Sequence, residues 1–96
     1  MNVKTQFGIA KDIYVDYWEG DGTYLLADVD NPEDTEDEFT ILGVDTPIEG
    51  DNEWRFWIGK GIEDGNGVRE YIPAELSKKD EQRLIDYIED FLDEGN

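Results

Sequence analysis

The chain has 96 residues, which is enough for one domain with a modest core. It carries 26 acidic and 8 basic residues, a net charge of −18, and neither histidine nor cysteine. This composition excludes disulfides, thiolate and imidazole metal sites, and nucleophilic enzymes of the Ser-His-Asp and Cys-His classes. Three Trp, five Tyr, four Phe and nine Ile still predict a folded domain, because disordered chains are poor in aromatic and β-branched residues.

Strands are predicted where apolar and polar residues alternate between turn signals. In the first strand, alternation places Ile13 and Val15 on one face and Tyr14 on the other. The five predicted strands are residues 9–18, 23–29, 38–44, 53–62 and 68–72. Acidic turns containing glycine or proline are expected between several of them, at residues 19–22, 46–52 and 63–67. Residues 30–37 are expected to form an acidic loop, since they contain a proline and no hydrophobic residue to bury.

A C-terminal helix is predicted beyond Pro73, which ends the fifth strand. Ser77 is expected to cap this helix, because its hydroxyl can accept a hydrogen bond from a first-turn N–H group. Asp80 then falls in the first turn, where the helix dipole favours negative charge, and Gly95 provides a stop. The apolar stripe of the helix has the spacing of one helical face and consists of Leu84, Ile85, Ile88, Phe91 and Leu92.

These elements predict a single α+β domain over residues 1–96. Its sheet is expected to be an antiparallel meander of about five strands, with the C-terminal helix packed on one face. In the fourth strand, alternation directs Trp54, Phe56 and Ile58 toward the core. Their expected partners on the helix are Leu84, Ile88 and Phe91.

Trp57 falls on the opposite, outer face of the predicted sheet, which Trp18 and Tyr14 are expected to share. Two interpretations of this aromatic group stay open. One is cross-strand packing on a solvated face. The other is an aromatic anchor inside an acidic rim, an arrangement typical of the hot spots of protein interfaces.

The negative charge is concentrated in two parts of the chain. Between Lys11 and Arg55, a window of 43 residues holds 15 acids and no cation. Residues 84–96 hold five more acids and again no Lys or Arg. Solubility alone calls for a net charge of magnitude about 2–8. Because self-repulsion on this scale destabilises a compact state, the excess charge indicates a function.

Part of this charge forms a row on the solvent face of the predicted helix, at Asp86, Glu89, Asp90 and Asp93. A solvated helix face is the ordinary explanation of such a row. However, like charges four residues apart destabilise a helix, and no Lys intervenes here. One helical turn separates these carboxylates by roughly 5–6 Å along the axis. Because backbone phosphates have a comparable separation, the row can occupy the phosphate subsites of a nucleic-acid-binding protein.

The predicted function is therefore an acidic inhibitor that mimics nucleic acid and blocks a basic nucleic-acid-binding protein by occupying its phosphate-binding surface. In size, charge and aromatic-rich α+β character, the chain resembles the DNA-mimic inhibitors of phages and mobile elements, including anti-restriction and anti-CRISPR proteins. The resemblance involves no motif, so it assigns no role to any residue. The residues predicted to bind the partner are Asp28, Asp30, Glu33, Asp34, Glu36, Asp37, Asp86, Glu89, Asp90, Asp93, Trp18 and Trp57.

Enzymatic, metal and cofactor chemistry is not expected. Carboxylate pairs suited to acid–base catalysis occur by chance among 26 acids, and a domain of this size rarely encloses a substrate cleft. Residues 28–33 begin like a calcium-binding loop, but Glu33 stands where glycine is required and Phe39 where a bidentate Glu is required. Residues 59–61 lack the glycines and the Ser or Thr of a phosphate-binding loop, and a strand end or bulge is expected there.

Three other functions stay open from the sequence. An immunity protein or antitoxin that neutralises a basic nuclease would use the same physics. A halophile housekeeping domain fits less well with nine Ile and with five Lys against three Arg. A calcium-binding module is the third. The net charge opposes direct binding to nucleic acid or anionic membranes, and without a signal or spanning stretch we expect a cytoplasmic location. Homodimerisation through an exposed edge strand is left open.

Overall fold

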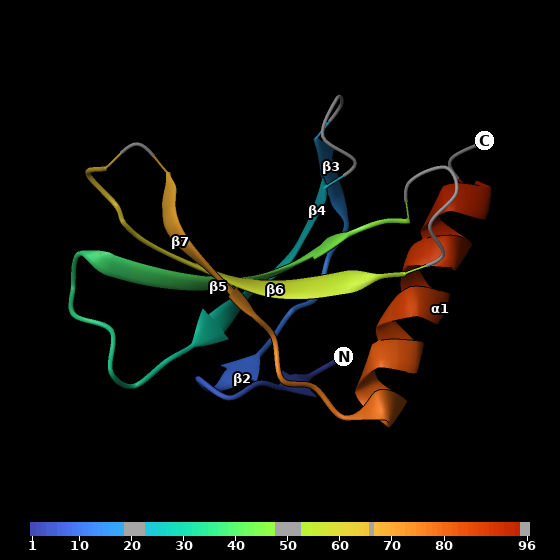
Figure 1. The fold of residues 1–96 in the computed structure, drawn as a ribbon, viewed down its shortest axis with the longest axis horizontal. Coiled ribbons are helices and arrows are strands. Elements are labelled where there is room, and N and C mark those ends of the chain that lie inside the picture. The colour runs from blue at the N-terminus through green and yellow to red at the C-terminus, as the bar shows by residue number, and fades with distance from the viewer. Residues whose placement is uncertain (19–22, 48–52, 66, 95–96) are drawn as a thin grey trace.

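The computed structural model describes residues 1–18, 23–47, 53–65 and 67–94, without the side chains of residues 16–18, 23, 25, 26 and 92–94. Within these ranges the chain forms strands and one long C-terminal helix, α1 (Figure 1). The elements are β1 (Val3–Lys4), β2 (Ile9–Ala10), β3 (Asp16–Trp18), β4 (Thr23–Asp30), β5 (Glu38–Asp45), β6 (Arg55–Ile62), β7 (Val68–Pro73) and α1 (Lys78–Glu94).

The strands form one antiparallel sheet in the order β1-β2-β4-β5-β6-β7, and β3 also pairs with β4. β2 and β3 lie one after the other along the same edge of β4, so the sheet is six strands wide. The predicted α+β fold is confirmed, and the strand beyond the expected five is β1. Short connections between neighbouring strands account for the antiparallel order from β4 to β7.

The first predicted strand, residues 9–18, is not continuous. Asp12 interrupts it with a left-handed backbone, φ 54°, and the chain regains regular pairing only at β3. Asp tolerates this conformation better than most residues. The interruption has a packing consequence, because Ala10 and Ile13 are both buried although they are three residues apart. In a regular strand, residues an odd number apart face opposite sides.

A hairpin at the N-terminus was not predicted from the sequence, because strands of two residues carry no readable alternation. β1 pairs with β2, and the side chain of Val3 in β1 is buried in the core. The Thr5 hydroxyl donates to the carbonyl of Gly8 at 2.8 Å and accepts from the N–H groups of Phe7 and Gly8 at 3.2 Å. The hydroxyl thus adds to the backbone hydrogen bonds that Thr5 and Gly8 make with each other, at 2.8 and 3.4 Å, and stabilises the turn.

The core lies between one face of the sheet and α1. Leu42 and Ile58 from the central strands and Leu84 and Ile88 from the helix are completely buried in it. The expectation that Phe91 belongs to this contact is wrong, because 43% of Phe91 is exposed. The buried part of the helical stripe therefore ends at Ile88 within the described side chains.

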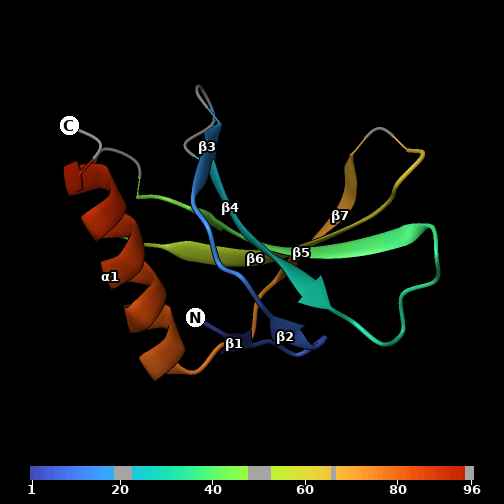
Figure 2. The ribbon, with the colours of Figure 1, turned by 180° about the vertical axis from the view of Figure 1, so that it is seen from behind.

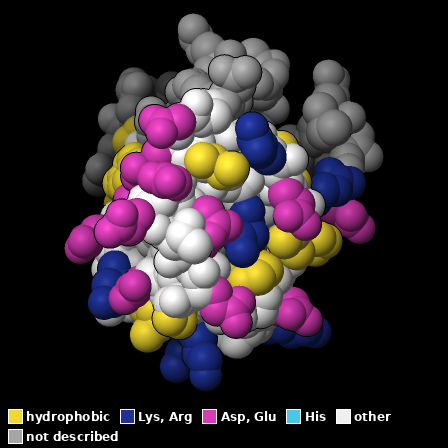
Figure 3. Space-filling model, turned by 90° about the vertical axis from the view of Figure 1, so that its left-hand side faces the viewer, with side chains coloured by type: hydrophobic (Ala, Val, Ile, Leu, Met, Phe, Trp, Pro, Cys, Tyr) yellow, Lys and Arg dark blue, Asp and Glu magenta, His cyan; other side chains and the backbone are white. Residues whose placement is uncertain are grey.

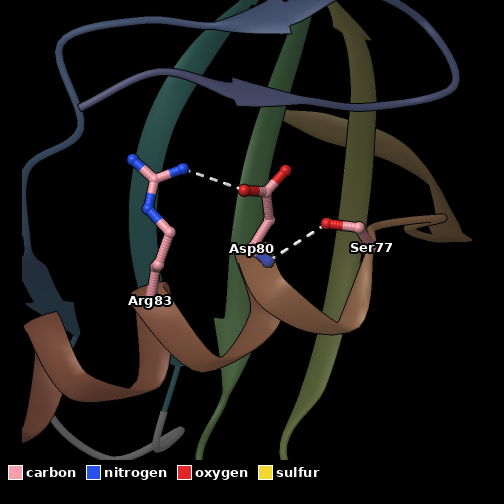
Figure 4. A network of polar contacts seen from close by, with 3 residues as sticks. All are labelled: Ser77, Asp80 and Arg83. Atoms are coloured by element: carbon pink, nitrogen blue, oxygen red, sulfur yellow. Dashed lines mark hydrogen bonds and ion pairs between the residues drawn. The ribbon is translucent and has the colours of Figure 1, made fainter.

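The start of α1 follows the sequence prediction (Figure 4). The N–H of Asp80 donates to the Ser77 hydroxyl at 3.1 Å, which is the predicted cap. The carboxylate of Asp80 also accepts a hydrogen bond from Arg83 at 2.9 Å, one turn further on. Among the described residues, no helix is both long and apolar enough to cross a membrane.

Gly8 in the N-terminal hairpin is expected to tolerate substitution poorly. Its φ is 152°, and a Cβ atom there would lie 2.1 Å from the carbonyl oxygen of Asp30. We expect Gly8→Ala to lower the free energy of unfolding by about 2 kcal/mol or more, as measured by urea denaturation.

The matched control is Gly67→Ala. Gly67 also has a positive φ, 85°, but no atom lies within 4 Å of the added Cβ. Its substitution should therefore cost only the conformational penalty, about 1 kcal/mol. Equal losses for the two variants would show that the contact with Asp30 does not limit the hairpin.

Candidate protein-binding surfaces

The predicted partner-binding acids do not form one continuous surface. The molecule extends 38 Å along its longest axis. The loop between β4 and β5 lies at one end of this axis, and α1 lies at the other (Figures 1 and 2). The predicted acids therefore form two separate candidates for a partner contact. We call them the loop group, which consists of Glu33, Asp34, Glu36 and Asp37, and the helix group, which consists of Asp86, Glu89, Asp90 and Asp93.

One acid of the loop group, Asp34, is engaged inside the loop. Its carboxylate accepts a hydrogen bond from the Thr40 hydroxyl at 2.8 Å and one from the Asn31 amide at 3.3 Å. The Asn31 side chain also accepts from the N–H of Glu33 at 3.0 Å. Asn31 and Thr40 are buried, so Asp34 compensates polar groups that water does not reach. This carboxylate shapes the loop and is poorly placed to meet a partner.

The remaining acids of the loop group, Glu33, Glu36 and Asp37, are exposed. Glu38 follows them at the start of β5. Hydrogen bonds from Thr35, with help from the charge of Lys60, lower the pKa of the Glu38 carboxyl, so it stays ionised to lower pH than usual. Glu38 thus adds a further carboxylate beside the exposed acids of the loop.

The acids at the loop end of the molecule do not form a uniformly negative surface. Acidic side chains are interspersed with basic and hydrophobic ones on this face (Figure 3). Two acids of β4, Asp28 and Asp30, are also exposed, and Asp30 forms an ion pair with Lys11 at 3.5 Å. Positive charge is therefore close to parts of the loop end, which weakens its attraction for a cationic partner.

The helix group is more uniform. Asp86, Glu89 and Asp90 are all exposed in the C-terminal half of α1. Asp86 accepts a hydrogen bond from the Gln82 amide at 2.9 Å, which leaves its negative charge in place. The last turn of the helix contains no basic residue. Asp93 lies in the same helix, but its side chain is outside the described part of the structure.

Trp57 is not the exposed anchor that one interpretation of the sequence expected. Only 9% of it is accessible, and its indole N–H donates to the Asp45 carboxylate at 3.2 Å. Its ring contacts the edge of Tyr71 on β7, with 5.1 Å between centroids and a 70° interplanar angle. The structure thus shows the alternative, cross-strand aromatic packing, and 64% of Tyr71 remains exposed. The side chain of Trp18 is outside the described part.

A feature missed from the sequence is a run of glycines opposite large side chains on the outer face. Successive outer-face pairs between β5 and β6 are Phe39 with Gly61, Ile41 with Gly59, and Gly43 with Trp57. A Cβ on Gly43 would lie 2.1 Å from the Trp57 ring, and one on Gly61 would lie 2.6 Å from the Phe39 ring. The large side chains therefore lie across the glycines. The signal was the spacing of two between Gly59 and Gly61, which puts both on one face.

A strand end or bulge was predicted at residues 59–61. These residues lie near the end of β6, where the pairing with β7 shifts register between Lys60 and Gly61 and leaves Arg69 of β7 as the extra residue. Within the described ranges, no three acidic side chains come together as metal ligands would. The comparisons with known proteins give no lead, because no family model, no curated protein and no solved structure matches the chain. Charge, burial and contact geometry are therefore the basis for a functional proposal.

Substitution of the hydrogen-bonded Asp34 and of an exposed acid of the same loop should have different effects on the free energy of unfolding. We expect Asp34→Ala to lower the free energy of unfolding by about 2 kcal/mol, because it leaves the buried Thr40 and Asn31 groups short of a partner. Glu36→Ala, at an exposed position of the same loop, should change it by less than about 0.5 kcal/mol. Chemical denaturation of both variants at neutral pH measures this, and a neutral Asp34→Ala would contradict a structural role for that carboxylate.

Proposed function

We propose that this protein is an acidic inhibitor that binds a basic, nucleic-acid-binding protein and occupies surface that the partner uses for phosphates. The observation that carries the proposal is the helix group, a row of exposed acids in the C-terminal half of α1. The basic residues of the helix, Lys78, Lys79 and Arg83, all precede this half. A partner that approaches the helix group therefore meets negative charge without a competing cation from the same part of α1.

The helix group is costly to the helix that carries it. The C-terminal end of a helix has a partial negative charge, so acids there are repelled and basic residues would be stabilising. Asp86 and Asp90 are also like charges at a spacing of four. Stability alone favours Lys or Arg at these positions. A binding role explains why the chain has acids there instead.

The spacing of the helix group suits a surface built for phosphates. Residues three or four apart on a helix lie about 4.5–6 Å apart along its axis. Phosphates along one strand of a duplex follow one another at about 3.4 Å of axial rise plus a helical offset. Lys and Arg side chains arranged to reach successive phosphates can therefore reach successive carboxylates on α1.

The loop group then acts at a distance. It lies at the far end of the molecule from α1, so contact with the helix group does not require contact with the loop group. Its charge still adds to the field of the whole protein, which attracts a basic partner and raises the association rate. At physiological salt such steering decays over about 8 Å, so the groups nearest the contact dominate the affinity.

Charge reversal at the helix group should improve stability while it removes binding. For the double variant Glu89→Lys/Asp90→Lys we expect the free energy of unfolding to rise by about 1 kcal/mol, because the like-charged pairs Asp86–Asp90 and Glu89–Asp93 become pairs of opposite charge. For a domain of this size, that raises the melting temperature by about 4–8 °C. The matched neutral variant, Glu89→Gln/Asp90→Asn, should show a smaller rise.

Binding is measured by retention of proteins from a bacterial lysate on the immobilised protein, eluted with a salt gradient and challenged with DNA. We expect a nucleic-acid-binding protein to elute at high salt and to be displaced by DNA. The Glu89→Lys/Asp90→Lys column should lose it, and the neutral variant should release it at intermediate salt. Unchanged retention by the charge-reversed variant would exclude the helix group as the contact surface.

A further inference from the structure

An open groove runs along the outer face of the sheet and reaches Glu81 in the first turn of α1 at one side. Its floor consists of Phe39, Ile41 and Trp57, and Val68 and Tyr71 of β7 extend it. These side chains are apolar or aromatic, and several of them remain partly accessible. An accessible apolar surface of this kind on a very polar protein indicates a binding site.

The floor of the groove is fixed before anything binds. The glycines opposite Phe39, Ile41 and Trp57 let these side chains lie flat over the neighbouring strand. The hydrogen bond from Trp57 to Asp45 and the ring contact with Tyr71 hold the indole in place. A ligand therefore pays little to order these residues, which favours affinity.

The ends of the groove are marked by exposed tyrosines. Tyr71 stands on β7, and Tyr14, 49% exposed, lines the groove at the opposite side, beside β4. From the segment of Tyr14 to β7 the groove crosses four strand spacings, or about 19 Å. At about 3.3 Å per residue, an extended chain covers this length with about six residues.

Charge at the groove determines what can occupy it. Asp28, Asp45 and Glu81 line the groove, against a single lining base, Arg55, which forms an ion pair with Glu53 at 3.5 Å. Asp28 is exposed and stands directly opposite Ile41 in the sheet. A second copy of this chain would bring another net charge of −18, so repulsion opposes self-association here. The groove instead complements a cationic chain.

We propose that this groove binds a short, extended, cationic segment of the partner protein, with alternate apolar side chains on the floor and intervening Arg or Lys side chains at Asp28 and Tyr71. An extended segment places alternate side chains on opposite sides, which matches an apolar floor beneath an acidic rim. A guanidinium group can also stack on the exposed ring of Tyr71. The proposal takes the basic partner from the proposed function but assigns it a second contact, separate from the helix group.

The test uses capped hexapeptides and the full chain. One peptide alternates Arg and Leu, and the other, of equal charge, alternates Arg and Ser. The affinities of both peptides are measured by calorimetry at about 0.1 M salt, where the Debye length is about 10 Å. Because the peptides carry the same charge, electrostatic attraction contributes equally to both affinities. We expect the Arg/Leu peptide to bind about tenfold more tightly, because its apolar side chains are buried. It should also shift the NMR signal of the Trp57 indole N–H, assigned with Trp57→Phe.

The variant Tyr14→Ala/Tyr71→Ala changes exposed residues only, so folding is expected to be retained, and circular dichroism checks it. This variant should bind both peptides more weakly, because the Arg side chains that stack on the tyrosines are common to both. Glu89→Lys/Asp90→Lys should keep the tenfold preference. Equal affinities of the two peptides for the original protein would overturn the proposal. So would an affinity of the Arg/Leu peptide that is unchanged by loss of both tyrosines, or a salt-stabilised dimer that the tyrosine variant abolishes, since a second copy would then be the occupant.

These outcomes separate the two proposals. If the peptides show no preference while charge reversal on α1 still abolishes partner retention, the groove assignment alone fails. If the preference holds while charge reversal leaves retention unchanged, the helix group fails as the contact surface and the groove assignment stands.

Discussion

The rest of the structure depends on the pairing of β5 with β6, which runs without interruption over all eight residues of each strand. One face of this pair supplies Leu42, Val44 and Ile58 to the core, against which α1 is buried. The other face carries the glycine and aromatic pairs that form the groove floor. A shift of one residue in this register would exchange the two faces, so a single pairing decides both the core and the groove.

This pairing must hold the fold together against strong self-repulsion. The protein opposes repulsion by placing its acids on exposed loops and on the solvent side of α1, with the core itself entirely apolar apart from a few satisfied polar groups within the described residues. The two acidic groups are also separated by the length of the molecule, which lowers their mutual repulsion. The remaining local cost, at the end of α1, is what motivates a binding role there.

Elements with a regular period were predictable from the sequence. The helix with its Ser77 cap and four of the strands followed from local pattern, because 3.6- and two-residue periods report directly on which face is buried. The left-handed backbone of Asp12 could not be recognised, since apolar alternation does not report on a single residue of positive φ and many Asp residues in this chain have ordinary backbones. Charge alone identified the acidic residues but not their roles. Only tertiary contacts reveal that the Asp34 carboxylate is hydrogen-bonded to Thr40 and Asn31, and that most of the Trp57 side chain is buried.

The glycine pairs on the outer face limit which substitutions this sequence can accumulate one at a time. The space above Gly43 is already filled by the ring of Trp57, so a larger residue at position 43 becomes acceptable only when residue 57 becomes smaller. The same holds for Gly61 and Phe39. The two residues of each pair are therefore expected to covary. A substitution at the glycine alone is destabilising, and a smaller side chain at its partner compensates for it. Drift across this surface is then slow and occurs by paired changes, even where neither residue touches a ligand.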